Sequence, residues 1–131
     1  MRKSLLIARF KIGCIVLFSF LLFSVIPAIA QTIPASEAQF HIGEYQVVKG
    51  YVASTHYAKN SNGKPTFLNV GNPYPNQDFT IVIWGSDRSK FSQAPEYYYN
   101  HKTVLVEGVI SQYRGVPQII VKDESQIKIV H

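Results

Sequence analysis

Hydrophobic and polar residues alternate with a period of two in five stretches of this chain, within residues 47–52, 66–70, 79–84, 102–110 and 118–129. This period is typical of β-strands that bury one face. In each stretch one of the two alternating sets is almost wholly apolar, and we expect that set to face a common core. The expected inward residues are Val48, Val52, Leu68, Val70, Phe79, Ile81, Ile83, Val104, Val106, Ile110, Ile119, Val121, Ile127 and Ile129.

The connections between these stretches carry turn and helix signals. Residues 54–65 are polar and predict a loop that turns near Asn60–Gly63. Residues 86–101 do not alternate, and Pro95 within them suits the first turn of a short helix. Gly50 interrupts the first stretch and is expected to mark a bend or a β-bulge.

A short helix is predicted before the first strand. Ser36 and Gln39 have the spacing of a capping box, so a helix is expected from Glu37 to about Ile42, ending at Gly43. Together the elements favour an all-β fold. The predicted architecture is a five-stranded Greek-key barrel, with one short helix between strands 3 and 4 and another at the N-terminal side.

The first thirty residues have the layout of a secretory signal peptide. Four basic residues precede an apolar run at residues 12–26, and Ala28-Ile29-Ala30 follows as a small-residue cleavage site. We expect cleavage after Ala30, and an uncleaved N-terminal anchor is the alternative. The predicted organisation is a signal peptide at 1–30, a tether and the start of a helix at 31–40, and the barrel domain at 41–131. The expected location is the periplasm or the exterior of the cell.

Removing this segment lowers the formal net charge of the chain. Four of the thirteen basic residues lie within it and all eight acidic residues lie after it, so the formal charge falls from +5 to +1. Any polyanion must therefore be bound by a local patch rather than by the overall charge. The single cysteine, Cys14, also lies in the apolar run, so the remaining chain has no disulfide and depends on its hydrophobic core.

Four short motifs carry a family resemblance: Phe67–Asn69, Tyr74–Thr80, Val82–Gly85 with Arg88, and Tyr113–Ile119. They resemble the nucleic-acid-binding OB-fold domains of exported bacterial proteins, some of which are attached to extracellular nucleases. The resemblance covers the chain from about His41 to Ile129. It implies an OB-fold barrel that binds nucleic acid. It does not imply cleavage, because in the nuclease fusions the chemistry belongs to a separate domain.

An OB-fold binds its ligand across strands 2 and 3, between two flanking loops. The outward residues expected on this ribbon include two aromatic rings on which bases could stack, and basic residues lie in the adjoining segments. Each position also has a structural interpretation, because the tryptophan could be core and the cations could be solvated. The predicted nucleic-acid-binding residues are Lys64, Phe67, Asn69, Thr80, Trp84, Arg88, Lys90, Tyr113 and Arg114.

Catalytic and metal-binding patterns are absent from the sequence. The four histidines are scattered, and the carboxylates form no cluster that could hold catalytic cations. No nucleophile elbow or phosphate-binding glycine loop is present. We therefore expect no enzyme activity and no cofactor. In Tyr97–Tyr99, adjacent residues of one helical turn point in different directions, so we expect at least one tyrosine in the core and one exposed.

The sequence as a whole predicts an exported protein that binds nucleic acid, with single strands favoured and weak sequence preference. The mature form is expected to have no membrane contact. Two alternatives remain open: an OB-fold module that binds a small cationic molecule or an oligosaccharide, and a module that docks on another exported protein such as a nuclease. The choice between DNA and RNA and the oligomeric state also remain open.

Overall fold

The computed structural model describes residues 21–24 and 31–131, so most of the expected signal peptide lies outside the described residues. The strands are β1 (Thr32–Pro34), β2 (Tyr45–Tyr57), β3 (Thr66–Val70), β4 (Phe79–Ile83), β5 (Thr103–Tyr113), β6 (Val116–Ile120) and β7 (Ile127–Ile129). The helices are short: the 3-10 helices η1 (Ala35–Phe40), η2 (Gly85–Lys90) and η3 (Glu124–Gln126), and the α-helix α2 (Pro95–Tyr98). The mostly-β class predicted from the sequence is confirmed.

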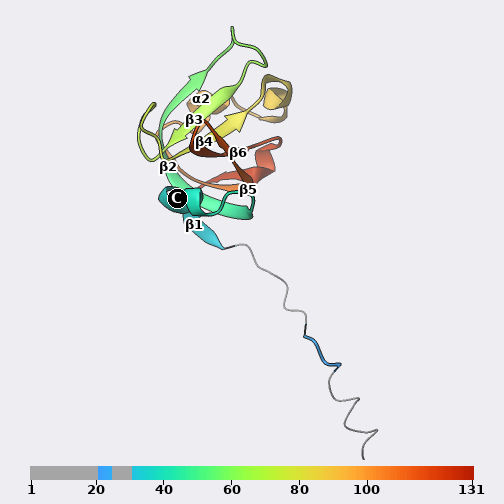
Figure 1. Ribbon diagram of the computed structural model, residues 1–131. Helices are drawn as coiled ribbons and strands as arrows, with labels where there is room; N and C mark the ends of the chain where they lie inside the picture. The colour runs from blue at the N-terminus through green and yellow to red at the C-terminus, as the bar shows by residue number, and fades with distance from the viewer. Residues whose placement is uncertain (1–20, 25–30) are drawn as a thin grey trace, which may run out of the picture.

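The strands curl around one another into a rounded unit (Figure 1). They form one sheet in the order β1-β2-β3-β4-β6-β5-β7, and an additional pairing of β2 with β5 closes β2, β3, β4, β6 and β5 into a ring. Within the ring only β4 and β6 run parallel. The sheet therefore has seven strands where the sequence predicts five. The additional ones are β1, within the predicted tether, and β7, which pairs with β5 as a separate strand.

The ring encloses the hydrophobic core expected from the alternation. Every inward residue predicted from Val48 to Ile127 is buried, and Ile129 is partly buried against the same cluster. The tyrosine run divides as predicted, since Tyr99 is buried and Tyr97 is exposed. These assignments succeed because side chains on a strand alternate strictly between the two faces of the sheet.

β2 is longer than predicted and bends at a different place. The sequence predicts a loop from Ser54, but β2 continues through Tyr57 and pairs there with β3. Its register shifts between Val52 and Ser54, not at Gly50. Gly50 instead allows a close approach, because a Cβ there would clash with the side chain of Val70. The prolonged strand adds Ser54, Thr55 and His56 to the lining of the groove described below.

The N-terminal helix also differs from the prediction. η1 begins at Ala35 with Pro34 at the N-cap position, and no side chain caps it. Gln39 bonds to the backbone oxygen of Ser36 at 3.4 Å, so the expected capping box does not form. The reason is that Thr32–Pro34 already pairs with β2, which fixes where the helix can start. No helix in the described residues is long and apolar enough to cross a membrane.

Candidate functional site

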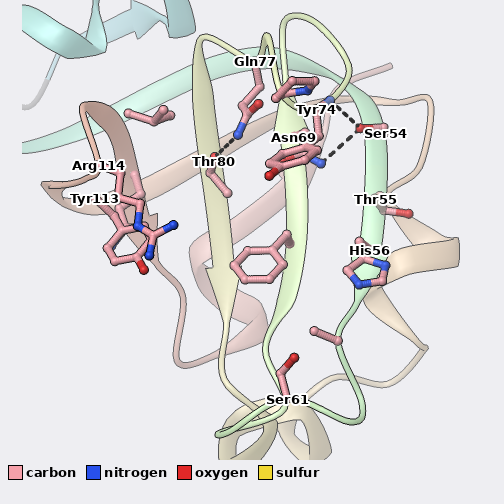
Figure 2. A pocket seen from close by; sticks show the side chains of 15 residues that line it. Ser54, Thr55, His56, Ser61, Asn69, Tyr74, Gln77, Thr80, Tyr113 and Arg114 are labelled. Atoms are coloured by element: carbon pink, nitrogen blue, oxygen red, sulfur yellow. Dashed lines mark hydrogen bonds between the residues drawn. The ribbon is translucent and has the colours of Figure 1, made fainter.

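A groove of about 750 Å³ lies over the outer faces of β3 and β4. Figure 2 shows β2 with His56 on one side of it and Tyr113 with Arg114 on the other. The segment after β2 contributes Ser61, and the β3–β4 loop contributes Tyr74. The groove is lined by Ser54, Thr55, His56, Ala58, Ser61, Phe67, Asn69, Tyr74, Pro75, Gln77, Thr80, Tyr113, Arg114, Val116 and Gln118.

A row of polar side chains crosses the floor of the groove from strand to strand. Backbone pairing aligns Ser54 with Asn69, Asn69 with Thr80, and Thr80 with Gln118, and the row ends at Ser111. Asn69 donates to Ser54 Oγ at 3.0 Å, and Gln118 donates to Ser111 Oγ at 3.3 Å. These bonds hold the two amides in fixed orientations.

The β3–β4 loop forms one wall of the groove and is tied to its floor. The backbone N–H of Tyr74 donates to Ser54 Oγ at 3.2 Å, the same oxygen that Asn69 bonds (Figure 2). Gln77 donates to Thr80 Oγ1 at 3.2 Å, and its own Oε1 is buried without a partner among the described residues. The Tyr74 ring is 73% exposed, so it is free to stack on a ligand.

The β5–β6 turn forms the facing wall. Tyr113 pairs with Val116, which leaves Arg114 and Gly115 as a two-residue turn with φ of +48° and +83°. Positive φ at both central residues is the geometry of a type I′ hairpin turn. The Arg114 guanidinium lies 5.3 Å from the centre of the Tyr113 ring, which is 61% exposed. The turn thus presents a cation and an aromatic ring together.

The groove brings together Phe67, Asn69, Thr80, Tyr113 and Arg114 from the predicted binding residues. Asn69 and Thr80 are nonetheless buried, because the β3–β4 loop and its hydrogen bonds cover the floor. Sequence reasoning missed the contributions of β2, the β3–β4 loop and the later part of the β5–β6 hairpin. The motifs Tyr74–Thr80 and Tyr113–Ile119 drew attention to two of these segments, and nothing drew attention to β2. The missed residues are Ser54, Thr55, His56, Ala58, Ser61, Tyr74, Pro75, Gln77, Val116 and Gln118.

Trp84 and Lys64 do not line the groove. The Trp84 ring lies against the turn after β2, where a Cβ on Gly63 would come within 2.8 Å of it. Trp84 is 39% exposed, so it is not part of the core, and it is not among the residues of the groove wall. Lys64 is exposed in the same turn, with a φ of +46°. Both residues belong to a small structure around Gly63 beside the groove.

Arg88 does not line the groove but makes contacts within the protein. Its guanidinium bonds Glu96 Oε1 at 2.7 Å and Thr66 Oγ1 at 2.8 Å, and it lies 3.8 Å from the centre of the Tyr57 ring. Thr66 is wholly buried, so these contacts join η2 and α2 to the ends of β2 and β3. Lys90 is paired with Asp87 at 2.9 Å. The sequence could not reveal these pairings, because they depend on how the η2–α2 segment folds back.

The Arg88–Glu96 pair shifts both pKa values away from neutrality. The hydrogen bond to Glu96 raises the pKa of Arg88 above its ordinary value. Burial alone would raise the pKa of Glu96, but the hydrogen bond from Arg88, a backbone hydrogen bond and the charge of Arg88 together outweigh burial, and the pKa lies below its ordinary value. Both groups are therefore charged at neutral pH, and the Arg88 guanidinium is paired with the Glu96 carboxylate.

Arg114 is the one formally charged side chain that lines the groove, and no carboxylate lines it within the described chain. The other polar lining groups are hydroxyls, amides, the His56 imidazole and the tyrosine phenols. In residues 21–24 and 31–131, no three metal-ligating side chains lie close enough to hold a metal ion. The groove is suited to binding a planar or polar ligand by stacking and hydrogen bonding.

No protein-family model and no curated protein sequence matches the chain. Solved structures give distant matches. One is a protein assigned as an aspartyl-tRNA synthetase from Leishmania major Friedlin, with a TM-score of 0.48 and 14% identity over 82% of this chain and 22% of that one. Another is OBody AM1L10 bound to hen egg-white lysozyme, with a TM-score of 0.47 and 17% identity over 82% of this chain and 98% of that one. A third is the asparaginyl-tRNA synthetase of Entamoeba histolytica, with a TM-score of 0.47 and 13% identity over 79% of this chain and 24% of that one.

The chain spans less than a quarter of the length of the two synthetases. With TM-scores below 0.5, these similarities carry no argument about what this protein binds. Any such argument must come from the ring of strands and the groove themselves.

Proposed function

We propose that this protein is an OB-fold module that binds single-stranded nucleic acid with weak sequence preference. The fold assignment is supported by the order of the ring, β2-β3-β4-β6-β5, with its helical segment between β4 and β5. In an OB-fold the corresponding second and third strands carry the ligand. Here those strands are β3 and β4, and the groove lies over both.

The observation that carries the proposal is the set of aromatic rings around Arg114. Phe67 lies on β3, Tyr74 on the β3–β4 loop and Tyr113 at the end of β5, so three elements each bring one ring to the groove. Unpaired bases stack on such rings with about 1–3 kcal/mol per base and little sequence preference. Arg114 adds a group that binds phosphate or stacks on a base. A duplex keeps its bases paired and would not offer them to these rings.

The test is a titration of the protein, purified after export, with labelled single-stranded oligonucleotides at several salt concentrations. Because one cation lines the groove, we expect a log–log salt slope of about −0.7 to −1.4, as for one or two phosphate contacts on a single strand. Tyr74→Ala should weaken binding by about 1–3 kcal/mol. Tyr97→Ala, at an exposed tyrosine of α2 that does not line the groove, is the matched control. A folded protein that binds no oligonucleotide at low salt would refute the proposal.

A second candidate is supported by the neutral character of the floor. Hydroxyls and amides supply most of the polar lining, and one guanidinium supplies the charge. Such a groove with aromatic walls also suits an oligosaccharide or another small polar ligand. That ligand would bind with almost no salt dependence, which separates the two candidates in one titration. Docking on another exported protein, such as a nuclease, is the remaining alternative.

We also propose that the protein is exported, with residues 1–30 as a signal peptide, and that it binds without catalysis. The N-terminal pattern of charge, apolar run and small residues supports export. The absence of any carboxylate from the described groove lining supports a binding role. Incubation of a labelled oligonucleotide with the protein and Mg²⁺ should leave the oligonucleotide intact.

A further inference from the structure

We propose that His56 is a second anion-binding group of the groove, engaged only when its imidazole is protonated, so that affinity for nucleic acid rises in acid. The inference rests on the proposed function and adds a regulatory feature to it. His56 lines the groove from β2, and its side chain is exposed to solvent. Nothing in the sequence pattern singled it out, because residues 54–65 were expected to form a loop.

The position of His56 complements that of Arg114. Figure 2 shows the two side chains on opposite sides of the groove. The Arg114 turn lies at the start of β6, and β3 and β4 separate β6 from β2. The two walls are therefore three strand spacings apart, roughly 14 Å along the sheet. A strand of nucleic acid lying across the floor from the Arg114 wall would reach the His56 wall. With neutral His56 that second wall offers no cation to a phosphate.

The surroundings of His56 favour this use of its charge. Its backbone partner on β3 is Phe67, and no side-chain hydrogen bond or ion pair of the described residues engages the imidazole. The other groove groups that titrate or carry charge are Tyr74 in the β3–β4 loop and Tyr113 with Arg114 in the β5–β6 turn. On α2, next to β2, the Glu96 carboxylate is bonded to Arg88. Thus no acidic group of the groove lining would neutralise a protonated His56.

Histidine gains its charge between about pH 8 and pH 5 in ordinary surroundings. Below this range the groove would hold two cations on facing walls, and above it only Arg114. An added exposed charge contact changes affinity by at most roughly fivefold, which corresponds to about 1 kcal/mol. One more phosphate contact also steepens the single-strand salt slope by about 0.7.

The experiment compares binding of labelled oligo(dT) at pH 5.5 and pH 8.0, with thymine chosen because its base does not titrate in this interval. We expect the wild-type protein to bind more tightly at pH 5.5, by up to about fivefold, with the steeper salt slope. His56→Gln should bind equally at both pH values, at the wild-type level of pH 8.0. His56→Lys should bind at both pH values as tightly as the wild-type protein binds at pH 5.5. His131→Gln, at an exposed C-terminal histidine outside the groove, should keep the wild-type pH dependence.

The outcomes separate the two proposals. Wild-type binding that is the same at both pH values, or a pH dependence that persists in His56→Gln, would overturn the role of His56 and leave the proposed function standing. Absence of oligonucleotide binding at either pH would overturn the proposed function itself. Circular dichroism of each variant at both pH values confirms that the barrel is folded where binding is measured.

Discussion

Arg114 occupies a backbone conformation that most side chains avoid, since its φ is +48°. Asparagine and glycine are the preferred residues at this position of a type I′ turn. An arginine there is a poorer choice for the turn itself, and its guanidinium is the one formal charge on the groove lining. The residue is better explained by what its side chain contacts than by the hairpin that holds it.

Replacing Arg114 with asparagine separates these two contributions. Arg114→Asn keeps a residue that tolerates positive φ, so the midpoint of urea unfolding should stay the same or rise slightly. The single-strand salt slope should become shallower by about 0.7 because one phosphate contact is lost. Lys122→Asn, at an exposed lysine outside the groove, should leave the slope unchanged. An unaltered slope in Arg114→Asn would exclude the guanidinium from the binding surface.

Ser54 connects the floor of the groove to its wall, because its hydroxyl oxygen accepts from both Asn69 and the backbone of Tyr74. Ser54→Ala removes both acceptor interactions and leaves the buried Asn69 amide without this partner. We expect a loss of about 1–3 kcal/mol in the free energy of unfolding, measured with urea. Ser86→Ala, at an exposed serine of η2, should change it by less than about 0.5 kcal/mol. Equal values for the two variants would contradict the role given to Ser54.

At the scale of elements, the core strands could be predicted and the groove only in part. Strict alternation identified the buried faces of β3, β4 and β5, since a single register shift would move every side chain to the other face. The extension of β2 was missed because its residues from Ser54 to Tyr57 are all polar or aromatic and lack an apolar partner set. Loops have no periodic signal at all, so the wall formed by Tyr74 could not be derived from spacing.

The η2–α2 segment closes one side of the barrel through Arg88 and Glu96, and the stability of this contact depends on pH. The pKa of Glu96 is lowered in the folded state, so its contribution is present above the ordinary glutamate value of about 4.3 and is lost as the pH falls through the folded value. Glu96→Gln should cost about 2–3 kcal/mol at pH 7, because it leaves a partly buried guanidinium unpaired.

Urea unfolding at pH 7 and pH 3 checks this dependence. The wild-type protein and Glu96→Gln should differ clearly at pH 7, and the difference should shrink at pH 3, because the stability that the lowered pKa of Glu96 supplies is lost as the pH falls. Glu37→Gln serves as the control, since Glu37 is exposed on η1 and makes no ion pair among the described residues. A gap between wild type and Glu96→Gln that stays the same at both pH values would show that the charge of Glu96 does not matter.

At the scale of the whole molecule, the proposed removal of residues 1–30 would change the net charge of the protein. Cleavage after Ala30 would leave a formal charge of +1 in place of +5, and the first strand, β1, would begin two residues after the cut. Intact-mass measurement of protein recovered from the producing cell should give a chain that starts at Gln31. A mass that matches a start at Met1 would show that the segment is retained, and the anchor alternative would then replace export with cleavage.

The double pairing of β2 sets the order in which the barrel can form. Its second half pairs with β3, its near neighbour in sequence, but its first half pairs with β5, which is synthesised much later. Folds closed by such distant pairings form slowly, on the order of milliseconds to seconds. A chain that emerges from its N-terminal end can therefore build the β2–β3–β4 meander early but cannot close it. Until β5 has been synthesised the ring cannot close, and under the proposed export this would leave the chain open for translocation.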